Sequence, residues 1–163
     1  MRLALLSDIH DHTMHLLLAL EEARRQGCTH LLFVGDMVGA STFHTLREEW
    51  SYPIDLVLGN NEYELTSFRQ MAQVWPQTTL HGYMGRVCIG GKVICFTHLP
   101  WDAHKEAATG KYDAVFYGHT HKAEVSMLGN TILANPGEIQ GRSGKCSFAV
   151  YDTETNKVTL IPI

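Results

Sequence analysis

The sequence lacks several features that would assign it to a specialised class of protein. No apolar run reaches the roughly 18 residues that a membrane-spanning helix needs. The first apolar run gives way to Ser7-Asp8 too early for a signal peptide. We therefore expect a cytoplasmic, soluble protein with no membrane partner. The four cysteines form no Cys-x-x-Cys pair, which argues against a zinc ribbon and favours reduced thiols.

Positive charge is also scarce. Thirteen lysines and arginines stand against 17 acidic residues, and the formal net charge is -4. A protein that binds nucleic acid nonspecifically needs a basic face, so we expect no nucleic-acid partner larger than a small nucleotide. No repeat, low-complexity tract or linker interrupts the 163 residues, which predicts a single domain over residues 1–163. The residue type in excess is histidine, with ten copies.

The first third of the chain alternates short apolar runs with an amphipathic segment. Residues 3–6, 31–34 and 55–58 are typical of buried strands. Residues 13–26 carry apolar side chains at helical spacing, and Gly27 follows as a stop signal. A strand, a helix and a further strand in this order open an α/β unit.

After about residue 80 the pattern changes to β-hairpins. The predicted hairpins are residues 86–96 around Gly90-Gly91, residues 125–134 around Gly129-Asn130, and residues 147–161 around a polar turn. Residues 101–111 predict a helix or a loop. Hairpins that follow α/β units predict an α/β fold in which two sheets pack as a β-sandwich with helices on the outside.

Most of the predicted strands end in a side chain that can bind a metal ion. These side chains are Asp8 and His10, Asp36, Asn60, His98, His119 and His121, and Asn135. Ligand sites of α/β sheets lie at the carboxyl ends of strands, so we expect these groups to converge on one rim. If residues 115–122 continue as a strand, alternation points His119 and His121 to the same face.

With Asn135 set aside, the inventory is two carboxylates, one amide and four imidazoles. This set is too large for one tetrahedral zinc ion and suits two divalent transition-metal ions. Helix or turn capping would explain each Asp or Asn singly, and a hydrogen-bonded core position each histidine. Four histidines at matching strand ends make these explanations weaker than a shared metal site. Asn135 stays equally compatible with capping a turn and with bonding a histidine.

The ordered motifs Asp-x-His, Gly-Asp, Gly-Asn-x-Glu, Thr-His, Gly-His-Thr-His and Asn-Pro-Gly resemble the calcineurin-like metallophosphoesterase superfamily, in particular its small prokaryotic phosphodiesterases. The resemblance runs from Asp8 to Gly137. It implies a four-layer fold, a two-sheet sandwich flanked by helices. It also implies a ligand set: Asp8, His10 and His121 for one metal, Asn60, His98 and His119 for the other, and Asp36 as the bridge. Mn²⁺ is the expected ion, with Fe, Ni and Zn as alternatives.

The activity that follows is hydrolysis of a small phosphate ester, in particular a phosphodiester, by metal-activated hydroxide. Three residues depart from the family pattern. Asn61 stands where many relatives have a histidine that assists the leaving group, which leaves Asn61 and His98 as candidate catalytic residues. Leu99 follows His98 where glycine is usual. Glu138 replaces a common serine and is expected to place an extra carboxylate near the phosphate site.

Two rival interpretations remain at this point. The chain could be a scaffold that keeps the fold without catalysis, as its resemblance to a retromer subunit permits, or a mononuclear metal sensor. The complete ligand set favours an enzyme, and a homo-oligomer stays open. A solvated surface position is the favoured interpretation of His12 and packing that of Trp101, but His12 is near enough for a substrate contact and Trp101 could stack on a base or aryl group.

Overall fold

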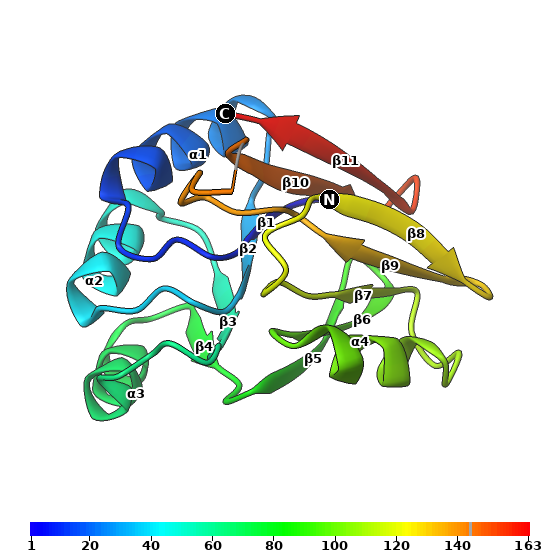
Figure 1. Cartoon of the computed structure of the whole chain (residues 1–163), viewed down its shortest axis with the longest axis horizontal. Coiled ribbons are helices and arrows are strands. Elements are labelled where there is room, and N and C mark those ends of the chain that lie inside the picture. The colour runs from blue at the N-terminus through cyan, green and yellow to red at the C-terminus, as the bar shows by residue number, and fades with distance from the viewer. Residues whose placement is uncertain (144) are drawn as a thin grey trace.

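The computed structural model describes residues 1–143 and 145–163, which form two β-sheets and four helices (Figure 1). In spatial order, the first sheet contains β11 (Lys157–Pro162), β10 (Ser147–Asp152), β1 (Arg2–Leu6), β2 (His30–Val34), β3 (Ile54–Val57) and β4 (Thr78–Leu80). Strands β1 to β4 run parallel, and β10 and β11 are antiparallel to their neighbours. The carboxyl ends of β1, β2 and β3 therefore meet at one edge.

The second sheet also has a parallel centre. Its spatial order is β5 (Met84–Ile89), β6 (Lys92–Thr97), β7 (Ala114–Phe116), β9 (Thr131–Asn135) and β8 (Glu124–Leu128). Strands β6, β7 and β9 are parallel, and the outer strands pair with them as hairpins. The carboxyl ends of β6 and β7 thus form a second row of loops.

The helices cover the outer faces of the two sheets. The helices of the first sheet are α1 (Thr13–Arg25), α2 (Ala40–Glu49) and α3 (Leu65–Val74), which Figure 1 shows along one side of the molecule. Helix α4 (Pro100–Ala107) covers the second sheet, and proline at its start suits the first turn of a helix. None of the helices in the described part of the chain combines the length and apolarity needed to cross a membrane.

Three apolar clusters fill the space between the layers. Leu3, Leu5 and Leu32 of the first sheet pack against Phe96 and Phe116 of the second, which forms the core between the sheets. A larger cluster joins the first sheet to α1, α2 and α3, and a smaller one joins the second sheet to α4. The four-layer α/β fold predicted from the sequence is confirmed.

The three predicted hairpins and the amphipathic helix are confirmed, and the uncertain segment 101–111 contains α4. Sequence patterns missed α2, α3 and β4. Neither helix begins with a side-chain cap, and α3 buries only Phe68 fully. Contacts distant in sequence hold these helices instead: the rings of Phe43 and Phe68 stack with centroids 5.2 Å apart.

One local prediction was wrong. Strand β7 ends at Phe116, so His119 and His121 do not continue it as alternating residues. Both histidines have left-handed backbones, with φ of 69° and 60°. The loop instead directs the two rings to different neighbours, Asn60 for His119 and Asp8 for His121.

Candidate metal centre

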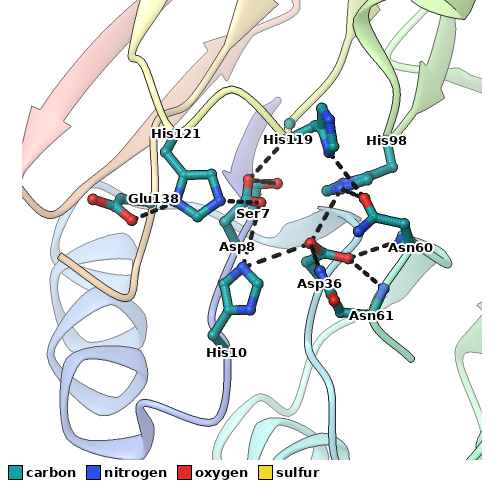
Figure 2. Close-up of polar contacts among 12 residues, drawn as sticks. Ser7, Asp8, His10, Asp36, Asn60, Asn61, His98, His119, His121 and Glu138 are labelled. Carbon is teal, nitrogen blue, oxygen red and sulfur yellow. Dashed lines mark hydrogen bonds and ion pairs between the residues drawn. The ribbon is translucent and has the colours of Figure 1, made fainter. Parts of the chain in front are cut away.

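The seven predicted metal ligands lie together on the rim where the two sheets meet. Loops that follow β1, β2, β3, β6 and β7 supply them, and Figure 2 shows their side chains facing a common centre. Ligand atoms of neighbouring residues approach to between 2.9 Å, from His119 Nδ1 to Asn60 Oδ1, and 3.8 Å, from His10 Nε2 to Asp8 Oδ1. Segments up to 113 residues apart in sequence, from Asp8 to His121, thus form one site.

Asp8 has one oxygen engaged by the protein and one left free. Oδ2 accepts hydrogen bonds from Ser7 Oγ at 2.5 Å and from the His119 amide at 3.1 Å. Oδ1 faces His121 Nε2 at 3.3 Å and His10 Nε2 at 3.8 Å. Asp8 Oδ1 and His10 Nε2 are buried without a hydrogen-bond partner among the described residues. A buried polar atom left unpaired costs about 1–3 kcal/mol, and a cation held between these atoms would remove that cost.

Asp36 lies between the two groups of ligands. Its Oδ1 accepts the backbone amides of Asn60 and Asn61, each at 2.9 Å. Its Oδ2 accepts Asn61 Nδ2 at 2.7 Å and also faces His10 Nε2 at 3.6 Å and His98 Nε2 at 3.3 Å. One oxygen of Asp36 therefore points toward ligands of both predicted ions.

His98 has both ring nitrogens committed. Nδ1 donates to the Val34 carbonyl at 2.9 Å, so the lone pair of a neutral ring is on Nε2. Nε2 lies 3.1 Å from Asn60 Oδ1, and the side chain is 2% exposed. Two atoms that can share a cation thus face each other. In the neutral ring, this geometry supports the predicted ligand role of His98 and leaves no free N–H for its other predicted role, proton donation.

The charged groups of the centre shift one another's pKa values. Burial opposes ionisation of Asp36, but the adjacent His98 ring holds the pKa of this carboxyl well below its usual range. The Asp8 and Asp36 carboxylates raise the pKa of His10 against the effect of burial. The same carboxylates raise the pKa of His98, although desolvation lowers it. Negative charge that raises the pKa of neighbouring imidazoles also suits divalent cations.

Backbone strain is concentrated at the same place. Positive φ angles occur at Asp8 (53°), His10 (45°), Asp36 (62°), His119 (69°) and His121 (60°). A left-handed conformation costs an ordinary residue roughly 1–2 kcal/mol. Strain of this kind persists where the surrounding structure enforces it and clusters at functional sites. Five of the seven predicted ligands share it.

Two glycines let the loops approach one another closely. A Cβ atom on Gly59 would collide with the Asp36 carboxylate, and one on Gly118 would collide with Ser7 Oγ and Asp8 Oδ2. The glycines before Asn60 and His119 are therefore required for packing around the carboxylates, not only for turning the chain.

Asn135 acts on the backbone of the His119–His121 loop. Its Oδ1 accepts the Gly137 amide at 2.9 Å, and its Nδ2 donates to the Gly118 carbonyl at 2.8 Å and to Thr120 Oγ1 at 3.1 Å. Of the two alternatives for this residue, the turn is the one that these contacts match.

His12 and Trp101, the two other candidates for substrate contact, have different surroundings. His12 lies at the start of α1 and accepts the His15 amide at 3.4 Å, so it caps the helix. Trp101 is 59% exposed, and its ring meets the His119 ring edge-on with centroids 5.8 Å apart. Trp101 is therefore available at the rim of the site, whereas His12 has a structural use.

Sequence reasoning gave no role to Ser7 or Glu62 and did not find the partner of Glu138. Ser7 binds Asp8, and Glu62 accepts the Met37 and Gly59 amides at 2.7 and 2.6 Å, which holds the loops of Asp36 and Asn60 together. Glu138 was expected near the phosphate, but it is 1% exposed and its Oε2 lies 2.6 Å from His121 Nδ1. The glutamate of the Gly-Asn-x-Glu motif was a visible signal for Glu62. No local pattern indicates the contact of Glu138.

Comparison with known proteins shows the family of the chain. The model of the calcineurin-like phosphoesterase superfamily domain matches residues 1–156. The chain belongs to this superfamily. Its members are typically dependent on divalent metals, and two groups of this chain could each hold an ion: Asp8, His10 and His121, and Asp8, Asp36 and His98.

Individual relatives of this metallophosphoesterase include proteins with and without a named activity. It is 26% identical to phosphodiesterase MJ0936 of Methanocaldococcus jannaschii over 157 residues, 94% of each chain. The structure of an archaeal phosphodiesterase superposes with a TM-score of 0.92, at 24% identity and full coverage of both chains. Zinc-bound Vps29 of Entamoeba histolytica superposes with a TM-score of 0.66, at 17% identity, over 100% of this chain and 98% of Vps29.

Proposed function

We propose that this metallophosphoesterase hydrolyses small phosphodiesters with two divalent metal ions and a water nucleophile. The observation that carries the proposal is the position of Asp36 Oδ2, 3.6 Å from His10 Nε2 and 3.3 Å from His98 Nε2. A single carboxylate oxygen between two ligand groups is the arrangement that a bridged pair of ions requires. The 26% identity to an archaeal phosphodiesterase over nearly the whole chain supports the same reaction class.

Each residue of the site has a proposed role in binding one or both ions. Asp8, His10 and His121 would hold one ion, Asn60, His98 and His119 the other, with Asp36 shared. Bound divalent ions supply Lewis acidity and a water of lowered pKa for in-line attack on phosphorus. Ser7 is the hydroxyl beside Asp8, but it is fully buried and donates to Asp8 Oδ2, so it is unsuited to attack. Transfer directly to water needs no protein nucleophile.

A cavity of about 380 Å³ beside the second ligand group supports a diester substrate. Its lining includes Asn60 and His98, with apolar walls from Leu58 and Leu99 and a phenol from Tyr83. Leu99 makes one of these walls. The lining contains no lysine or arginine, which suits an organic substituent rather than a second phosphate. A diester also carries less negative charge than a monoester dianion.

Metal removal and reconstitution test this proposal. Protein stripped with a chelator should lose turnover of bis(4-nitrophenyl) phosphate, and Mn²⁺ should restore it together with two bound ions per chain. 4-Nitrophenyl phosphate, which has the same leaving group on a monoester, should react more slowly. Full activity after rigorous metal removal would contradict the metal mechanism. Faster hydrolysis of the monoester would contradict the diester preference.

The second candidate function is a metal-binding scaffold without catalysis. The fold shared with Vps29 and the asparagine at position 61 favour it. A protein that binds two Mn²⁺ ions but hydrolyses neither aryl ester would support the scaffold. Turnover that requires the bound ions would exclude it.

A further inference from the structure

Glu138 lies behind His121, on the side of the ring that faces away from Asp8 (Figure 2). Glu138 Oε2 is 2.6 Å from His121 Nδ1, and Oε1 is 2.5 Å from the Ser143 amide. On the opposite side of the ring, His121 Nε2 is 3.3 Å from Asp8 Oδ1. The His121 ring thus lies between Glu138 and Asp8, with Nδ1 toward Glu138 and Nε2 toward Asp8 Oδ1.

The backbone around Glu138 is anchored to the end of β1. The Ile139 amide donates to the Ser7 carbonyl at 3.1 Å, and the Gln140 amide donates to the Asp8 carbonyl at 3.0 Å. The Ser147 amide donates to the Glu138 carbonyl at 3.0 Å. Because the main chain is held on both sides, the carboxylate has a fixed position relative to Asp8.

The hydrogen-bond chemistry determines where His121 carries its proton. A carboxylate only accepts hydrogen bonds, so the contact with Glu138 requires hydrogen on His121 Nδ1. A neutral imidazole has one N–H, which leaves the lone pair on Nε2. That lone pair points at Asp8 Oδ1, an oxygen without a hydrogen-bond partner among the described residues. Two electron-rich atoms face each other, and a cation between them would bind both.

We propose that Glu138 is a positioning residue that selects the Nδ1–H tautomer of His121 and thereby prepares the ion site of Asp8, His10 and His121. The inference rests on the proposed metal function. Outer partners of metal-bound histidines orient the ring and increase its basicity, and their loss typically weakens metal binding by about 10–100-fold.

Glu138→Gln is a sharp test because both partners of Glu138 are donors. If the amide oxygen accepts from His121, the NH₂ group faces the Ser143 N–H. If the oxygen accepts from Ser143, the NH₂ group donates to His121 Nδ1 and moves the ring proton to Nε2, the nitrogen that must bind the ion. Glu138→Gln therefore keeps nearly the same side-chain shape but disfavours the Nδ1–H tautomer that metal binding by His121 Nε2 requires.

Asp55→Asn is the matched control. Asp55 also accepts from two donors, His30 Nε2 and His81 Nε2, each at 2.6 Å, and its side chain is 13% exposed. None of these three residues is a proposed ligand. Asp55→Asn also replaces a carboxylate that lies between two donors with an amide. It therefore controls for the effect of this exchange on stability at a place away from the metal centre.

Titration with Mn²⁺ and ¹⁵N NMR spectroscopy test this proposal, and the NMR measurement needs no metal. Calorimetric titration of stripped protein with Mn²⁺ should show one of two sites weakened by about 10–100-fold in Glu138→Gln and unchanged in Asp55→Asn. In a His121→Ala background, Glu138→Gln should add no further loss. The ¹⁵N spectrum of stripped wild type should show protonated Nδ1 and unprotonated Nε2 for His121, with a shift toward the other tautomer in Glu138→Gln.

The outcomes separate this inference from the proposed function. Equal Mn²⁺ affinity in wild type and Glu138→Gln, or equal losses in Glu138→Gln and Asp55→Asn, would overturn the positioning role. An Nε2–H tautomer in the wild type would also overturn it. A wild type that binds two ions but has no phosphodiesterase activity would refute the enzyme function while the role of Glu138 stands.

Discussion

At the scale of single residues, the site depends on side chains with one atom engaged by the protein and another left for a ligand. Asp8, Asp36 and His98 each bond a neighbour on one side and face the centre on the other. Held in this way, a ligand needs little rearrangement to bind an ion, which reduces the entropic cost of binding.

Asp36 should be the most sensitive ligand because its Oδ2 faces both groups. Asp36→Asn removes the negative charge of the proposed bridge and keeps its shape. We expect both ions to be lost, with a decrease in Mn²⁺ affinity larger than the roughly 10–100-fold typical of an outer partner. His10→Ala should lose mainly one ion. Metal analysis of both variants checks this, and two ions with normal activity in Asp36→Asn would refute the shared role.

We expect Asn61 to determine which leaving groups depart well. Its Nδ2 donates to Asp36 Oδ2 at 2.7 Å, and an amide has no titratable proton for a departing alkoxide. General-acid help is typically worth about 10²–10⁴-fold. We expect rates of the wild type to fall steeply as the leaving group becomes more basic, and to fall less steeply in Asn61→His.

The control for Asn61 is its alanine variant. Asn61→Ala removes the hydrogen bond to Asp36 without adding an acid, so its dependence on leaving-group basicity should stay as steep as that of the wild type. A series of diesters with leaving groups of increasing pKa provides the measurement. A flat series in the wild type would mean that another group already donates the proton.

At the scale of elements, the loops after parallel strands bring the ligands together, and glycines set how near they come. Gly118 follows β7 and lies against Ser7 and Asp8. Gly118→Ala should push the loop away from Asp8 and destabilise the fold by about 1–3 kcal/mol, as overpacking does. Mn²⁺ binding should weaken as well.

Gly85→Ala in β5 is the comparison for this prediction. A Cβ there would collide with the Phe96 ring in the core between the sheets, away from the ligands. Urea unfolding should show a loss of stability in both variants, but only Gly118→Ala should bind Mn²⁺ less tightly. Equal Mn²⁺ affinity in Gly118→Ala and wild type would mean that the loop tolerates the displacement.

At the scale of the whole molecule, a polar cluster near the edge of the first sheet links stability to pH. Burial opposes ionisation of Asp55, but hydrogen bonds from His30 and His81 hold its pKa at about 2. The unfolded value is about 3.9, so the folded pKa is the lower one. The stabilisation is therefore present above about pH 4 and lost as the pH falls toward 2, and it amounts to something on the order of 2 kcal/mol.

Urea unfolding of wild type and Asp55→Asn checks this prediction. The wild type should be the more stable protein near neutral pH, and the difference should shrink as the solution is acidified through the window between the two pKa values. A difference that stays constant down to about pH 2 would assign the effect of Asp55 to its shape and not to its charge.

The sequence by itself predicted most of the strands, the three hairpins and the residues that meet at the candidate metal centre. A short apolar run indicates a buried strand without information from distant residues. Four such runs are followed within a few residues by Asp8, Asp36, Asn60 or His98. Parallel strands bring such ends to one edge, so the ligand inventory follows from local pattern and one rule of topology. Helices α2 and α3 were missed because their local signals are weak.

Only the tertiary structure decided how the ligands are held. The left-handed backbones of His119 and His121 come from the surrounding loops, since an isolated histidine avoids that conformation. The contact of Glu138 with His121 joins the ends of two neighbouring strands, and no spacing in the sequence indicates it. Contacts between distant segments depend on how the sheets and loops pack, and this packing is a property of the whole chain.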